Sequence, residues 1–106
     1  MNYISSIIQI LEIPTIESYA DNIKMVRFRV QLPHTRNKVQ SPIIINSTIW
    51  GDLAYDVANY YRVNDYALVE GYLSTLLDNT DNQGSITINI TKLYPFLFTL
   101  ESNKQD

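Results

Sequence analysis

Hydrophobic and polar residues alternate along several short segments of the chain, and this pattern predicts a protein built mainly from β-strands. The alternation is cleanest between Val26 and Leu32, where every second residue is apolar and the residues between them are polar. A period of two indicates a strand with one buried side and one solvent-facing side. The segments with strand character are Tyr3 to Leu11, Met25 to Leu32, Ile43 to Trp50, Tyr66 to Leu76 and Ile86 to Ile90.

One segment follows a helical pattern instead. After Gly51, Asp52 offers an N-cap side chain, and apolar residues then recur at helical spacing for about ten residues. Five strands with one helix between the third and fourth is the order of the OB fold, an all-β Greek-key barrel that commonly binds oligonucleotides or oligosaccharides. An SH3-like barrel is the main alternative, but it has no such helix at this point. Gly71, inside the fourth strand, predicts a bulge or sharp bend.

The length and composition restrict the class of protein. A chain of 106 residues allows one domain, which we assign to residues 1–97, followed by a short polar tail at 98–106. The absence of cysteine excludes disulfides and thiolate metal sites, and a zinc site or a nucleophilic triad would depend on His34 alone. We therefore expect no catalytic residue, no metal and no cofactor. No apolar run approaches the ~20 residues of a membrane span, and no signal peptide precedes the first strand, so we expect an intracellular protein.

The charges are unevenly distributed along the chain. The formal net charge of −3 argues at first sight against binding to nucleic acid. However, no acidic residue lies between Asp21 and Asp52, a window that contains the basic residues Lys24, Arg27, Arg29, Arg36 and Lys38. This window covers the second and third strands and their loop, where an OB fold binds its ligand. Acidic residues gather instead in the connection between the first two strands, at Glu12, Glu17 and Asp21.

Two stretches of the chain resemble a known family. The run Ile49-Trp50-Gly51-Asp52-Leu53-Ala54 resembles the aromatic-Gly-x-Leu-Ala stretch of bacterial single-stranded DNA-binding proteins, and Leu68-Val69-Glu70-Gly71-Tyr72-Leu73 resembles their Val-x-Glu-Gly-x-Leu strand. The resemblance covers roughly residues 2–97 in one register. It is strongest to short, tail-less members from cyanobacteria and plastids, which agrees with the AT-rich codons of the abundant isoleucine, asparagine and tyrosine. The family resemblance implies an OB fold, binding of single-stranded DNA and assembly into homodimers or homotetramers.

The chain also departs from that family. The family usually carries arginines and a tryptophan after its Glu-Gly pair, whereas the segment from Tyr72 to Leu77 has no basic residue. A second stacking position in the third strand, often tryptophan in the family, is Ile44. We also expect the chain to lack the glycine-rich tail with an acidic tip that recruits other proteins in the family's main version. Of the usual stacking set, Trp50 alone is plainly retained.

The candidate site combines basic and aromatic residues. Single-strand binding without sequence preference needs a basic groove together with aromatic faces for the bases. We expect Arg27, Arg29, Arg36 and Lys38 to contact phosphates, and Trp50 and Tyr72 to stack on bases. Each of these residues has a structural alternative, which is solvation or ion pairing for the basic residues and core packing for Trp50.

Two functional hypotheses follow. The first is a non-enzymatic protein that binds single-stranded DNA, or RNA, in replication, recombination or repair. The second is an OB-fold adaptor or structural subunit with little nucleic-acid binding, which the acidic net charge and the lost arginines favour. The first strand has apolar residues on both sides, which indicates that its outer face or edge meets another copy. We expect a homodimer or homotetramer, located in a plastid stroma or a cyanobacterial-type cytoplasm.

Overall fold

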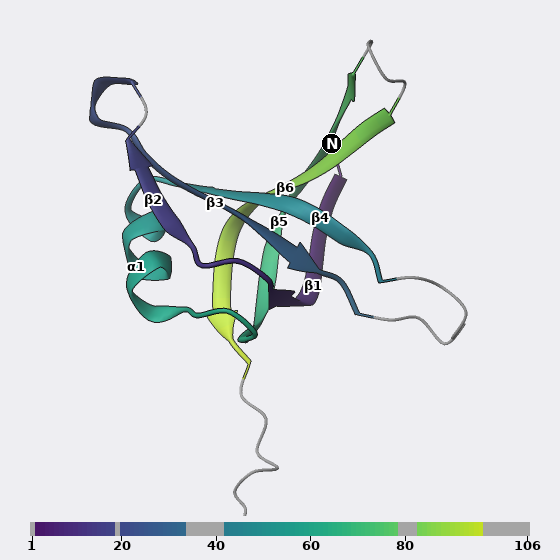
Figure 1. Cartoon of the computed structure of the whole chain (residues 1–106), viewed down its shortest axis with the longest axis horizontal. Coiled ribbons are helices and arrows are strands. Elements are labelled where there is room, and N and C mark those ends of the chain that lie inside the picture. Colours follow the sequence, from purple (N-terminus) through teal and green to yellow (C-terminus); the bar gives the residue numbers. More distant parts are fainter. Residues whose placement is uncertain (1, 19, 34–41, 79–82, 97–106) are drawn as a thin grey trace, which may run out of the picture.

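The computed structural model describes residues 2–18, 20–33, 42–78 and 83–96, and Figure 1 shows their arrangement. The strands are β1 (Asn2–Ile10), β2 (Thr15–Ser18), β3 (Lys24–Gln31), β4 (Ile44–Trp50), β5 (Tyr66–Asp78) and β6 (Gln83–Pro95). The helix α1 (Asp52–Tyr60) lies between β4 and β5, and a short 3₁₀ helix, η1 (Ala20–Asn22), lies between β2 and β3. The tail expected at 98–106 lies outside the described residues.

The strands form one sheet that returns on itself. Its order is β1-β5-β6-β4-β3-β2, and a further pairing joins β1 to β3. β1 pairs with β5 along most of its length, and at Gln9 and Ile10 it pairs with β3 on its other edge. All pairings are antiparallel except that of β4 with β6. This arrangement confirms the predicted OB fold.

The predicted alternation on β3 is confirmed by burial. Val26, Phe28 and Val30 are almost completely buried, whereas Arg27 and Arg29 between them are exposed. The same side of the other strands supplies most of the remaining core, including Ile8, Ile10, Ile49, Ala67, Val69 and Ile88, and the helix adds Ala54 and Val57. One polar side chain among the described residues, Ser47, is fully buried, and its hydroxyl donates to the Phe28 carbonyl at 2.7 Å.

The helix begins one residue earlier than the sequence predicted, at Asp52 instead of Leu53. Gly51, with φ at 79°, is the N-cap, and Asp52 is the first helical residue and makes no capping hydrogen bond. Glycine adopts such a positive φ without the strain that a side chain adds. Ala54 and Val57 are buried, and α1 contacts β2, β3 and β4. Within the described residues, no helix is long and apolar enough to span a bilayer.

Two features differ from, or extend, the pattern predicted from sequence. The four-residue strand β2 lies in what the sequence indicated to be a connection, and it pairs with β3 along its whole length. A strand so short shows no readable alternation, so its existence depends on this pairing. The bulge predicted at Gly71 is confirmed, because the β5–β6 register shifts between Glu70 and Gly71. A Cβ at Gly71 would lie 2.1 Å from the Asn89 carbonyl oxygen, so glycine is required there.

Candidate nucleic-acid interface

The outer side of β3 and β4 gathers most of the described site candidates. We call this surface, formed by Arg27, Arg29, Asn46, Thr48 and Trp50, the arginine face. In the antiparallel register, Arg27 lies opposite Thr48 and Arg29 lies opposite Asn46, so their side chains leave the sheet on the same side. The two arginine side chains are 58% and 57% exposed. A ligand from solution therefore has access to both guanidinium groups.

Trp50 belongs to the same face. It is the last residue of β4, two positions after Thr48, and strand alternation therefore places the two on one side of the sheet. Its strand partner is Met25, two positions before Arg27, which makes Trp50 a diagonal neighbour of Arg27. Trp50 is 44% exposed, so it is not the core residue of the structural alternative. The fold thus brings the retained aromatic residue and two basic residues together.

A row of directly paired residues connects the arginine face to Tyr72. Thr48 pairs with Asn89 of β6, and Asn89 pairs with Tyr72 of β5. The Thr48 hydroxyl donates a hydrogen bond to the Asn89 side-chain oxygen. Tyr72 pairs in turn with Tyr3 of β1. The row Arg27, Thr48, Asn89, Tyr72 and Tyr3 crosses neighbouring strands with one residue on each.

The far end of this row carries an aromatic pair. The rings of Tyr3 and Tyr72 meet edge to face with their centroids 4.8 Å apart. The Tyr3 hydroxyl donates to Glu70 Oε1 at 2.6 Å, and this hydrogen bond raises the pKa of Tyr3. We call the surface formed by Tyr3, Glu70 and Tyr72 the tyrosine face. Sequence reasoning missed Tyr3, and the signal that could have found it is its place as an outward residue on the strand predicted to meet another copy.

The charge asymmetry expected from the sequence is wrong in three dimensions. Glu17 of β2 and Glu12 just before it were assigned to a loop away from the binding residues. The Glu17 Oε1 lies 3.0 Å from Arg27 Nη2, and Glu12 Oε2 lies 2.9 Å from Arg29 Nε. The reason is the unforeseen strand β2, whose pairing with β3 brings the acidic connection over the arginines. Both described arginines of the candidate site are therefore ion-paired.

Glu12 is held at two points. Its Oε1 accepts a hydrogen bond from the Arg29 backbone N–H at 2.9 Å, while Oε2 accepts one from Nε of the same residue. The backbone hydrogen bond and then the side-chain hydrogen bond of Arg29 lower the pKa of Glu12 below its usual value. The carboxylate therefore stays charged beside Arg29.

The remaining basic candidates are placed only in part. Lys24, at the start of β3, donates a hydrogen bond from Nζ to the Ser18 hydroxyl at 2.8 Å. Arg36, Lys38 and His34 lie outside the described residues. Among the described residues, no group of three or more histidine, cysteine, aspartate or glutamate side chains could hold a metal ion.

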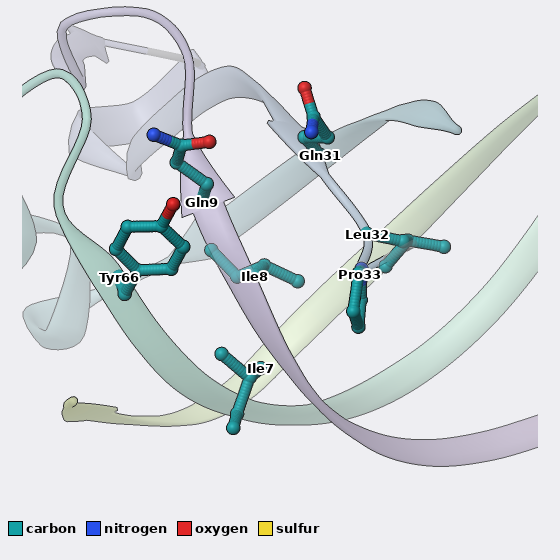
Figure 2. Close-up of a pocket in the computed structure, with 7 residues that line it drawn as sticks. All are labelled: Ile7, Ile8, Gln9, Gln31, Leu32, Pro33 and Tyr66. Carbon is teal, nitrogen blue, oxygen red and sulfur yellow. The ribbon is translucent and has the colours of Figure 1, made fainter. Parts of the chain in front are cut away.

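A small pocket borders the arginine face where β3 ends (Figure 2). Gln31 follows Arg29 at the next outward position of β3 and pairs with Gln9 of β1. The pocket has a volume of about 200 Å³ and is lined by Ile7, Ile8, Gln9, Gln31, Leu32, Pro33 and Tyr66. Its walls are mainly aliphatic, with the Tyr66 ring on one side and the two amide groups at the rim. The pocket extends the face without adding charge.

The chain is similar to proteins of known sequence and structure. No family model matches it. It is 35% identical, over 113 aligned positions that cover 100% of the chain and 99% of the relative, to a protein of Trieres chinensis described as "Putative single-stranded DNA-binding protein ycf41".

Solved structures share the fold at lower identity. The SSB domain of a Synechococcus sp. protein has a TM-score of 0.71 at 21% identity and covers 89% of this chain and 94% of that one. A small single-stranded DNA-binding protein from Streptomyces coelicolor has a TM-score of 0.73 at 19% identity, with coverage of 92% and 96%. The second single-stranded DNA-binding protein of Mycobacterium smegmatis has a TM-score of 0.72 at 20% identity, with coverage of 98% and 97%. By its full-length identity to the ycf41 relative, the chain belongs to the single-stranded DNA-binding protein family.

Proposed function

We propose that the chain binds single-stranded DNA on the arginine face, without catalysis. The observation that carries this proposal is the placement of Trp50, Arg27 and Arg29 on one exposed side of β3 and β4. Stacking of a base on an aromatic ring contributes about 1–3 kcal/mol, and arginine pairs with phosphate through several N–H donors. The name of the full-length relative supports the same ligand. Arg36 and Lys38 would add phosphate contacts beyond the described strands.

The test is a titration with an oligo(dT) of about 35 nucleotides, which spans more than one site of roughly 4–16 nucleotides per OB fold. Trp50 is the single tryptophan, so its fluorescence reports on the arginine face alone. We expect saturable quenching at about 50 mM salt and much weaker binding at about 200 mM. If the four proposed basic residues each neutralise one phosphate, the log–log salt slope per subunit is roughly −3. A duplex of the same length is the control.

The absence of any change in Trp50 fluorescence at low salt, with the protein folded, would overturn this function.

One observation favours the adaptor as a second candidate. Each described arginine of the arginine face is already paired with a carboxylate, so the neutral face would suit a protein partner as well. The same titration separates the two functions, because an adaptor leaves Trp50 fluorescence unchanged with both DNA and an RNA oligomer of equal length.

The proposal includes self-assembly through β1. Along Asn2–Ile8, the described structure pairs β1 with β5 on one edge and leaves the other edge without a strand. An open edge presents unpaired backbone groups to a second strand, and a copy of the same β1 would satisfy them by two-fold symmetry. Sedimentation of the purified chain should therefore show a dimer or tetramer. A role in plastid DNA replication, recombination or repair is our proposal for its setting, supported by the abundance of residues that have AT-rich codons and by the diatom relative.

A further inference from the structure

The two described arginines of the arginine face are matched one to one by two glutamates that come from the chain just before them. Arg27 pairs with Glu17 across the β2–β3 register, and Arg29 pairs with Glu12. The four side chains are all roughly half exposed. They therefore lie where a ligand would arrive, and they contribute little to the core.

A carboxylate offers arginine much the same partner as a phosphate does. Both are anions with adjacent acceptor oxygens, and both suit the planar fork of the guanidinium group. Glu12 contacts Arg29 through Nε, and Glu17 contacts Arg27 through Nη2. A phosphate that uses these donors must first displace the carboxylate.

The carboxylates are held in position by the backbone. Glu17 is fixed by the pairing of β2 with β3, in which it lies opposite Met25. Glu12 accepts a second hydrogen bond from the Arg29 backbone N–H, and this bond also lowers its pKa. Because this contact is built into the fold, the carboxylate competes at a high local concentration whenever the strand is absent.

We propose that Glu12 and Glu17 are intramolecular competitors of DNA phosphate, and that they set the affinity of the arginine face. The inference rests on the proposed function. It assigns Glu17 of β2 and Glu12, which precedes β2, an inhibitory role in single-strand binding that ends when a phosphate replaces the carboxylate. Removing a glutamate should therefore strengthen binding, although no contact to DNA is gained.

The experiment compares Glu12→Gln and Glu17→Gln with Asp56→Asn, in the full chain. Asp56 is exposed on α1, so its substitution makes the same change in net charge away from the arginine face. Binding of a fluorescein-labelled oligo(dT) is measured by anisotropy at low and high salt. An exposed ion pair of the usual strength corresponds to about a 1.4- to 5-fold change in Kd, so each glutamate variant should bind tighter by that factor at low salt. The gain should shrink as salt weakens the competing pair in the wild type.

A double-mutant cycle tests whether Glu17 acts through Arg27. In an Arg27→Gln background, Glu17→Gln should no longer strengthen binding. Glu17→Thr, a good strand former at an exposed position, repeats the test if Glu17→Gln lowers the melting temperature. Two outcomes overturn this inference and leave the proposed function intact. In the first, wild type binds, but the glutamate variants gain no more affinity than Asp56→Asn. In the second, the gain from Glu17→Gln persists in the Arg27→Gln background. Failure of wild type and all variants to bind overturns both.

Discussion

The exposed side chains at the two ends of the row that crosses the sheet make different kinds of contact. At the arginine face, each cation is matched by a carboxylate from a neighbouring element. At the tyrosine face, two rings contact each other and one hydroxyl donates to Glu70. The first arrangement exchanges one anion for another at little cost, because exposed ion pairs are weak. In the second arrangement, part of each ring surface is already in contact with the other ring, although Tyr3 and Tyr72 remain 48% and 40% exposed. For this reason the proposed function assigns the first contact with DNA to the arginine face.

Of the substitutions that test this comparison, charge reversal at the arginine face should change the affinity for DNA most. In Arg27→Glu/Arg29→Glu, the loss of two charge-assisted contacts of about 1.5 kcal/mol each corresponds to roughly a 100-fold weaker Kd for oligo(dT). The positions are exposed, so circular dichroism should show an intact fold. Arg62→Glu/Lys92→Glu makes the same change in net charge at positions off the arginine face, and its Kd should change far less. Equal losses in both double variants would show that only the total charge matters.

Removal of the Tyr72 ring tests the other end of the row. If the strand runs from Arg27 along the row, Tyr72→Ala should weaken binding about fivefold, the equivalent of one weakly stacked base at about 1 kcal/mol. Tyr94→Ala is the matched control, because Tyr94 is similarly exposed on β6 and lies off the row. Anisotropy titrations of the two variants at one salt concentration provide the measurement. Wild-type affinity in Tyr72→Ala would restrict the binding site to the arginine face.

The ion pair of Glu12 should appear as a small pH-dependent term in stability. Arg29 lowers the folded-state pKa of Glu12 below 4.5, so the pair stabilises the fold above that pH. As the pH falls through the folded-state pKa, both states become protonated and the contribution is lost. Urea unfolding should therefore show wild type more stable than Glu12→Gln by under about 1 kcal/mol near neutral pH, with the difference vanishing once the pH is below the folded-state pKa. A difference that is constant with pH would indicate hydrogen bonding without a contribution from charge.

Periodicity was sufficient to predict the OB fold, except for β2, and to place Arg27 and Arg29 on the arginine face. The alternation around Phe28 placed Arg27 and Arg29 on the outer side of β3, and Gly71 correctly indicated a bulge. The ion pairs could not be found in the same way. Glu17 and Arg27 are ten positions apart and meet only because β2 pairs with β3. Tyr3 and Tyr72 are far apart in the sequence and meet through the β1–β5 register, which periodicity does not specify. The sequence shows how many charged residues a segment contains, but the pairing of strands determines which charged side chains lie next to each other.

The pairing of β1 with β5 also has a consequence for how the chain folds. Tyr3 must find Tyr72, and Ile8 must find Ala67, so the first strand to be synthesised pairs with one that follows much later. Such long-range pairings raise the entropy cost of the transition state and place β-rich domains in the slow range of milliseconds to seconds. At about 5–20 residues per second, the ribosome needs several seconds to deliver β5 after β1. During that time only Gln9 and Ile10 of β1 can form their native pairing, which is with β3, and the rest of this isoleucine-rich strand waits for β5.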